Sequence, residues 1–298
     1  MSKKIITQSF IGNFRDCPQY AYQHNVLGRI PNNANTVARD IGSAVHSGLE
    51  VWFRSGDATA ALAALELHKP NLDQLDYLKA LAMLGGYFKR WENPFTEFEV
   101  HHVEKEFAFD IPNTDYEFRG KIDVLLRDRR TGEWQLWDHK TSSRVDGDYI
   151  LKRWMDLQLN AYAIGASESL GLDIGSFVYD ILSKPELKLK KTETHPEFFA
   201  RLTEECSDPS RYMRQPYTKE DLRVDETRKQ IAGWIGSIIV AQETGFWGEN
   251  TSNCFKWGRA CEYWPLCISN RSALVADNGY TLQPVNPELT ASIKEETE

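Results

Sequence analysis

The sequence predicts an α/β protein with a mixed central β-sheet flanked by helices, and three observations predict it. Residues 36–55 repeat apolar side chains at helical spacing. Residues 99–139 form three runs that alternate apolar and polar residues, as strands do. Helical and strand patterns follow one another again across residues 149–182. Helices, then a three-strand meander, then a helix and a strand indicate a mixed sheet covered by helices.

The N-terminal region is expected to be helical. Residues 7–27 are rich in aromatic side chains and are broken near Cys17 and Pro18, because proline disrupts a helix. The amphipathic helix over residues 36–55 ends before Gly56, a residue that suits a helix C-terminus. The other expected helices cover residues 58–68, 72–91, 149–168 and 220–244.

The strand patterns come next. A turn at residues 112–115 separates the first two runs, and Gly132 lies in the connection to the third. The expected strands cover residues 99–111, 116–127, 134–139 and 176–182. The basic run 187–194 fits an edge strand, since lysines discourage edge pairing. The overlapping lysine-rich segment 184–191 is equally a candidate contact to a nucleic-acid backbone.

Composition bounds the class of protein. The chain has 298 residues, 41% hydrophobic and 26% charged, which is ordinary for a globular protein. It shows no long apolar run and no signal peptide, so we expect a cytoplasmic protein that does not enter a membrane. The net charge of −8 argues against a generally basic surface but allows a local basic groove. We expect one domain over residues 1–283 and an acidic, flexible tail over 284–298.

The segment Asp138-His139-Lys140 ends an apolar strand. Side chains alternate along a strand, so Asp138 and Lys140 point to the same side and His139 points away. A carboxylate can hold a divalent metal, a lysine can lie near an attacking water and a phosphate, and the His139 backbone carbonyl can reach the metal. An acid and a lysine at this spacing are common, however, and a solvated strand end explains them as well.

Asp123 strengthens the functional interpretation, because it is an acid inside the apolar preceding strand. The turn near Gly132 brings this strand beside Asp138. Two neighbouring carboxylates repel unless a cation lies between them, and Mg²⁺ prefers such oxygen ligands. A metal held there can activate water for attack on a phosphodiester. In the alternative, Asp123 pairs with Lys121.

The order of motifs resembles the PD-(D/E)xK nuclease superfamily in its RecB-like branch. That branch has a helical Gly-x-x-x-His, an acid on a strand, an acid-x-Lys pair and a helical Gln-x-x-x-Tyr. This sequence carries them in the same order, within residues 36–165: Gly42 and His46, Asp123, Asp138 and Lys140, Gln158 and Tyr162. The resemblance implies a restriction-endonuclease-like core with helical N-terminal and C-terminal additions.

The resemblance also implies roles for single residues. His46 would bind Mg²⁺ or Mn²⁺ together with Asp123, Asp138 and His139. Gln158 and Tyr162 would contact the substrate or brace the site. Without the resemblance, His46 reads as a buried, hydrogen-bonded histidine and Tyr162 as part of a packed helix edge. Glu106, on the strand before Asp123, is a further acidic candidate.

Five cysteines occur, and three of them cluster at Cys254, Cys261 and Cys267. An odd number in a chain of this class argues against a disulfide framework. Some RecB-like nucleases, among them AddB-type subunits and CRISPR-associated adaptation nucleases, hold a [4Fe–4S] cluster with one early and three late cysteines. Cys17 occupies the early position. Four thiolates can also hold zinc, and buried structural cysteines are the plainest alternative.

The expected function is that of a metal-dependent DNA nuclease. By resemblance, we expect an exonuclease in recombination, repair or phage DNA processing, in a prokaryotic or phage-infected cell. Its partners would be DNA, single-stranded or with free ends, and a protein of a recombination or repair complex. Two rivals are a noncatalytic DNA-binding or assembly subunit that keeps the fold, and a zinc-containing enzyme with another phosphodiester substrate.

Overall fold

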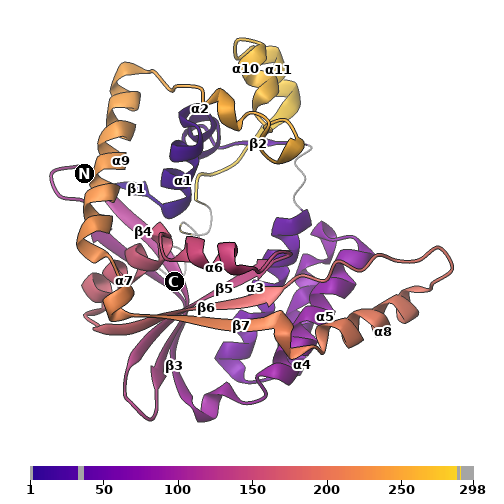
Figure 1. Cartoon of the computed structure of the whole chain (residues 1–298). Coiled ribbons are helices and arrows are strands. Elements are labelled where there is room, and N and C mark those ends of the chain that lie inside the picture. The colour runs from indigo at the N-terminus through magenta and orange to yellow at the C-terminus, as the bar shows by residue number, and fades with distance from the viewer. Residues whose placement is uncertain (1–2, 33–36, 287–288, 290–298) are drawn as a thin grey trace, which may run out of the picture. The chain divides into compact units, whose positions relative to one another are not determined.

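The computed structural model describes residues 3–32, 37–286 and 289 (Figure 1). The chain divides into two compact units, which are described one by one. Unit 1 combines Met1–Asn35, Ala108–Gly120 and Arg223–Glu298, and unit 2 combines Thr36–Phe107 and Lys121–Leu222. A single domain over residues 1–283 stays a prediction, and most of the expected tail lies outside the described residues.

Unit 2 contains a mixed sheet, as the sequence predicts. Strands β4 and β5 pair antiparallel, β5 and β6 pair parallel, and β6 and β7 pair antiparallel. Strand β3 also pairs with β4. The bounds are β3 Phe98–Asp110, β4 Tyr116–Asp128, β5 Trp134–Ser142, β6 Ile174–Ser183 and β7 Tyr212–Thr218. Both β3 and β4 continue into unit 1, with residues 108–110 and 116–120.

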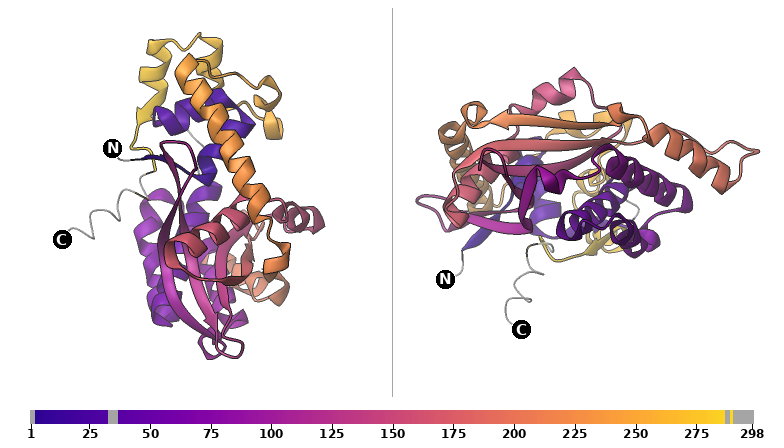
Figure 2. Two further views of the ribbon diagram at one scale, coloured as in Figure 1. Left: turned by 90° about the vertical axis from the view of Figure 1, so that its left-hand side faces the viewer. Right: turned by 90° about the horizontal axis from the view of Figure 1, so that it is seen from below.

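Helices cover both faces of this sheet, and Figure 2 shows strands β5 to β7 lying between them. One face carries α3 (Val37–Ser55), α4 (Ala58–Ala63), α5 (Gln74–Arg90) and α8 (His195–Cys206), and the other carries α6 (Gly147–Arg153) and α7 (Leu157–Leu170). A 3₁₀-helix, Ala64–Asn71, follows α4. The mixed α/β fold class is therefore confirmed.

The main core of unit 2 lies between the sheet and the layer of α3, α5 and α8. Helix side chains such as Leu49, Tyr87 and Phe198 pack there against Val124 and Trp137 of the sheet. Burying apolar surface of this kind contributes about 25 cal/mol per Å² to the stability of the fold. The core therefore supports the same strands that carry the acidic residues.

Two glycines allow helices to approach strands closely. A Cβ atom at Gly42 of α3 would lie 3.3 Å from Thr141 Oγ1 on β5. A Cβ atom at Gly165 of α7 would lie 1.9 Å from the Phe107 ring on β3, which is impossible without a shift. The packing of α7 on the sheet thus requires glycine at position 165.

Unit 1 contains the remaining helices and three short strands. Strand β1 (Lys4–Ile6) pairs in parallel with residues 116–118 of β4, and β2 (Arg29–Pro31) pairs antiparallel with β8 (Tyr280–Leu282). The helices are α1 (Gln8–Asp16), α2 (Pro18–Ala21), a π-helix (Tyr22–Val26), α9 (Val224–Thr244), α10 (Trp264–Ile268) and α11 (Ala273–Gly279). The break between α1 and α2 falls at Cys17, where the sequence predicts it.

Three of the differences between the structure and the expected elements lie in unit 2. Residues 187–194 form no strand, and the strand that pairs with β6 is β7 instead. The expected helix over residues 149–168 is two helices, because Asp156 accepts a hydrogen bond from Gln158 N and starts α7 anew. Helix α8 was not expected. A capping box between Thr194 and Glu197 begins it.

Candidate active site

Strands β4 and β5 bring Asp123 and Asp138 face to face at the end of their ladder. Val124 pairs with Trp137, so the next residue on each strand is Asp123 or Asp138. The backbone N–H of His139 donates a hydrogen bond to Asp123 Oδ2 at 2.8 Å. This bond ties the first acid to the strand that carries the second.

Asp138, Lys140 and Gln158 form a closed set of contacts. Lys140 Nζ lies 2.6 Å from Asp138 Oδ2. The Gln158 amide donates to Asp138 Oδ1 at 2.7 Å and accepts from Lys140 Nζ at 3.0 Å. Gln158 lies in the first turn of α7, where the Asp156 cap holds it. A helix that packs on the sheet therefore fixes the orientation of both strand side chains.

The electrostatics of the pair follow from burial and from mutual attraction. Burial raises the pKa of Asp138 to about 6, although the Lys140 ammonium acts against this rise. Burial alone would lower the pKa of Lys140, but the carboxylates of Asp138 and Asp123 outweigh it and raise that pKa. Lys140 therefore keeps its proton and supplies positive charge beside two acids.

His46 reaches the same group from α3. Its Nδ1 lies 3.5 Å from Asp123 Oδ2, and its ring packs edge to face on His139 at 6.0 Å. Burial lowers the pKa of His46, although Asp123 opposes this effect. The neutral imidazole that results is the form that binds metal ions.

Tyr162 lies one turn beyond Gln158 on α7. Its ring packs edge to face on Phe107 at 4.9 Å. Burial raises its pKa, while hydrogen bonds with Gln158 and with the Lys121 backbone lower it. The choice between substrate contact and bracing for Tyr162 stays a prediction.

Glu104 is an acidic residue that the sequence reasoning missed. It forms an ion pair with Lys121 at 2.5 Å. Burial raises the pKa of Glu104, Lys121 opposes this, and the nearby charge of Asp123 adds to it. Lys121 therefore pairs with Glu104, and the alternative Lys121–Asp123 pair does not form. Glu104 has a φ of 56°, and such a local irregularity cannot be read from a sequence. On the same strand, Glu106 Oε1 is buried without a hydrogen-bond partner among the described residues, and its role as a further acidic residue stays a prediction.

Behind the strand of Asp138, a buried polar network anchors the His139 side chain. His139 Nδ1 lies 3.1 Å from Asp180 Oδ2, which also accepts a 2.5 Å hydrogen bond from Tyr87. Arg214 Nε lies 3.5 Å from Asp180 Oδ1, and its guanidinium stacks on Trp137. Asp180 is fully buried. Burial would raise the pKa of Asp180, but Arg214 and His139 outweigh it and lower that pKa.

The residues fit a hard divalent cation. Asp138 Oδ2 is buried and accepts no well-aligned hydrogen bond from the described residues. Asp123 and Asp138 supply the oxygen ligands that Mg²⁺ and Mn²⁺ prefer, and the His139 carbonyl belongs to the same strand end. In the described residues, no three His, Cys, Asp or Glu side chains are gathered as a ready metal cage. The positive charge beside Asp138 is the ammonium group of Lys140.

The four cysteines of the expected cluster all belong to unit 1, and each has a free, partly buried thiol. The Asn250 N–H donates to Cys17 Sγ at 3.4 Å, and the Cys261 N–H donates to the Cys254 carbonyl at 2.6 Å. Burial raises the pKa of Cys261, and the charges of Cys17 and Cys254 add to it. Among the described residues, which include all four cysteines, these thiols are not gathered into a group that could hold a metal ion. Cys206 is buried separately in unit 2.

The family model of the PD-(D/E)XK nuclease superfamily matches residues 6–268. This is most of the chain, so the chain belongs to the PD-(D/E)XK nuclease superfamily. Membership supports a metal-dependent nuclease, a hydrolase of phosphodiester bonds that uses Mg²⁺ or Mn²⁺ and acts on DNA. The matched residues include β4, β5 and α7, which carry the candidate site.

Two further comparisons are less informative. No curated protein matches the chain. Among solved structures, the crystal structure of SSO0001 is similar at 18% identity, over 56% of this chain and 73% of that chain, with a TM-score of 0.25. An overlap of this size does not define a fold. Within the described residues, no helix has the length and apolar character needed to cross a membrane.

Proposed function

We propose that this chain is a DNA exonuclease of the RecB-like branch, with its active site at Asp123, Asp138 and Lys140. The observation that carries the proposal is the closed set of contacts among Asp138, Lys140 and Gln158, beside Asp123. A solvated strand end would leave these side chains exposed, whereas Asp138 is 1% exposed. Burying the Asp138 carboxylate beside the partly exposed Lys140 is energetically costly, and a functional role would explain why this arrangement is kept.

The residues divide the work in the following way. Asp123, Asp138, His46 and the His139 carbonyl would hold Mg²⁺ or Mn²⁺, which supplies Lewis-acid chemistry and a more acidic bound water. Lys140 orients the attacking water and stabilises the negative charge that develops on the phosphate. Gln158 keeps Lys140 and Asp138 aligned. Tyr162 braces the turn of α7 that follows.

The decisive test compares cleavage by wild type and by Lys140→Ala. End-labelled single-stranded and double-stranded DNA is incubated with Mg²⁺, with Mn²⁺ or with EDTA. We expect metal-dependent cleavage, with a product ladder that shows degradation from an end, and a loss of about 100-fold or more in the variant. Lys219→Ala, which removes an exposed ion pair with Asp173, is the matched control and should cleave normally.

Two other outcomes would change the proposed function. Internal cuts in circular DNA would show that the protein is an endonuclease and not an exonuclease. A folded wild type that cleaves neither substrate with either metal would favour the rival function, a DNA-binding or assembly subunit. We also propose that the biological role lies in recombination, repair or phage DNA processing, with a protein partner, and this rests on the resemblance alone.

For the cysteines, we propose a structural [4Fe–4S] cluster held by Cys17, Cys254, Cys261 and Cys267. Support comes from four free thiols in one unit that influence one another. Zinc is the alternative occupant. Anaerobically purified protein should contain iron and sulfide, and Cys261→Ser should lose both and melt at a lower temperature. Cys206→Ser is the control that keeps the iron. Zinc without iron, or a Cys261→Ser variant as stable as wild type, would contradict the proposal.

A further inference from the structure

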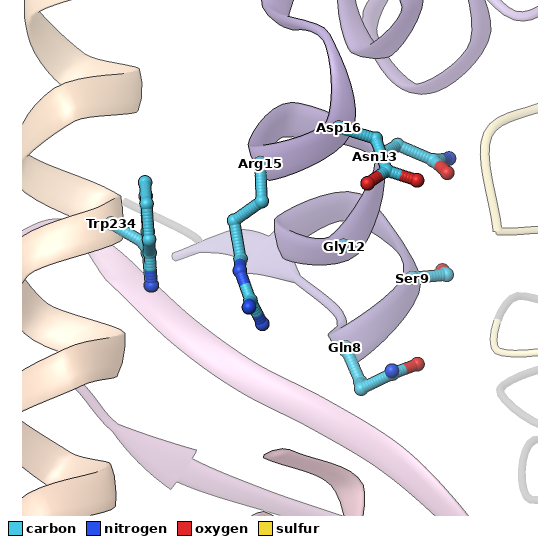
Figure 3. Close-up of a pocket in the computed structure, with 7 residues that line it drawn as sticks. All are labelled: Gln8, Ser9, Gly12, Asn13, Arg15, Asp16 and Trp234. Carbon is cyan, nitrogen blue, oxygen red and sulfur yellow. The ribbon is translucent and has the colours of Figure 1, made fainter. Parts of the chain in front are cut away.

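Helices α1 and α9 of unit 1 border a polar hollow that plays no part in the site described above. Its volume is about 600 Å³, within the range of pockets that hold small ligands. Figure 3 shows its lining: Gly12 at the centre of α1, Arg15 and Trp234 on one side, and Ser9, Asn13 and Asp16 on the other. The hollow thus combines one aromatic ring, one guanidinium and several hydrogen-bonding groups.

The charge of the lining favours an anionic ligand. The Asp16 carboxylate lies 3.2 Å from Lys256 Nζ, so its negative charge is already compensated. No carboxylate among the described residues forms an ion pair with Arg15, whose side chain is exposed. The uncompensated charge at the hollow is therefore positive, although the whole chain carries a net charge of −8.

Arg15 and Trp234 together offer a stacking surface. The Arg15 guanidinium carbon lies 5.6 Å from the centroid of the indole ring, which is half-buried on α9. Figure 3 shows the two side chains facing each other across the space between the helices. Indole rings and guanidinium planes are the two surfaces on which unpaired bases stack, and a guanidinium also binds phosphate.

Gly12 leaves the floor of the hollow open. It lies inside α1, where glycine costs about 1 kcal/mol relative to alanine. A Cβ atom at this position would meet nothing within 4 Å, so the surface of α1 is open there and a larger side chain would extend into the hollow.

We propose that this hollow binds one unpaired nucleotide of a single-stranded nucleic acid. Its base lies against Trp234, and its phosphate pairs with Arg15 on the same side of α1. A paired base in a duplex has no free face to offer to the indole, so the site selects single strands. The inference rests on the proposed function in one respect, which is that the chain acts on DNA.

The test measures binding without cleavage. Fluorescence anisotropy follows a labelled oligo-dT of about 12 nucleotides in EDTA, a length within the range that single-strand binding sites cover. Gly12→Leu fills the hollow, and Trp234→Ala removes the stacking surface. The matched control is Gly85→Leu, because Gly85 lies inside a helix as Gly12 does, and a Cβ atom at either position meets nothing within 4 Å. Thermal melting confirms that each variant is folded.

We expect Gly12→Leu and Trp234→Ala each to weaken single-strand binding roughly 5- to 100-fold, and Gly85→Leu to leave it unchanged. Duplex binding should not change in any variant. Equal binding by all variants, or no single-strand binding by wild type, would overturn the proposal. Thymidine monophosphate that competes as well as the oligonucleotide would replace a strand site by a free-nucleotide site.

Cleavage is assayed separately with Mg²⁺, so the two proposals can fail independently. If the variants bind like wild type and the protein cleaves DNA, the binding proposal is wrong and the nuclease proposal stands. If wild type binds through the hollow but cleaves nothing, the binding proposal stands and the nuclease proposal is wrong.

Discussion

The candidate nuclease site in unit 2 and the cysteine group in unit 1 are held by different means. In unit 2, side chains hold one another: Lys140, Asp138 and Gln158 close a ring of contacts, and Asp180 fixes His139 from behind. In unit 1, the cysteine contacts are to backbone groups, such as the Asn250 N–H that donates to Cys17.

The hydrophobic cores that surround the two groups of residues differ in size. The nuclease residues lie beside a large buried cluster formed by α3, α5, α8 and the sheet. Near the C-terminal cysteines, the buried cluster consists of Tyr263, Leu266 and Ala276, while Phe255 and Leu274 are exposed. A small core gives little stability without a further cross-link. The comparison teaches that the contacts of the first site are preorganised by its fold, whereas the second has a small core, which the proposed cluster would stabilise.

The largest expected effect is a loss of stability when the Asp180 network of unit 2 is disrupted. Asp180→Ala leaves Arg214 and His139 buried without their counter-charge, which should cost about 3–5 kcal/mol in the free energy of unfolding. Urea denaturation measures it. Asp173→Ala, which removes an exposed ion pair with Lys219, should cost less than about 1 kcal/mol. If both variants lost the same free energy of unfolding, the buried Asp180 network would contribute no more to stability than an exposed ion pair does.

The second effect concerns chemistry rather than stability. Asp123→Asn keeps the shape of the side chain but weakens metal binding and the contact with His46. We expect kcat/KM for DNA cleavage to fall by about 10²–10³-fold, with little change in melting temperature. Steady-state cleavage at several Mg²⁺ concentrations measures both. Normal cleavage by the variant would exclude Asp123 from the active site.

The third effect is a pH dependence that comes from Asp138. Its pKa rises from 3.8 in the unfolded chain to about 6 in the folded protein. The folded state therefore binds more protons between these values, and stability in EDTA should decrease as pH rises from about 4 to about 6, by on the order of 2–3 kcal/mol.

Denaturation in EDTA across this range measures the effect, and Asp138→Asn is the control. The variant should show a flatter profile because the group no longer titrates. Added Mg²⁺ should stabilise wild type more at pH 8 than at pH 5, since the metal binds the carboxylate form. The same slope in both proteins would assign the titration to other groups.

The smallest expected effect tests what Gln158 of α7 contributes to catalysis. Gln158→Ala removes the amide that aligns Asp138 and Lys140 but leaves their ion pair in place. We expect a loss of about tenfold in kcat, which corresponds to about 1.4 kcal/mol, with little change in KM. A rise in KM alone would instead indicate that Gln158 contacts the substrate.

The sequence was sufficient to predict the strands and the helix that carry the site. Alternation predicted β4 and β5 well enough to place Asp123 beside Asp138, and the helical period predicted that α3 presents His46. Local patterns of this kind are dictated by which face of each element is buried. The mixed sheet followed from the order of these elements.

The features that the sequence did not predict depend on tertiary context. Asp180 reads as one acid in an apolar strand, and its partners Tyr87 and Arg214 are far away in the chain. Strand β7 contains Pro216 and polar residues, so its pattern is weak. The lysine-rich run at 187–194 resembled a strand, but it connects β6 to α8 instead.

The Asp180 network also bears on how faithfully the sheet is assembled. His139, Asp180 and Arg214 are direct neighbours in register on β5, β6 and β7. A strand that slipped by two residues would keep the facing of its side chains, yet it would bury one of these charges opposite an apolar side chain. The row of charges therefore favours the native register of the three strands. That register places Asp180 beside His139, on the strand that carries Asp138 and Lys140.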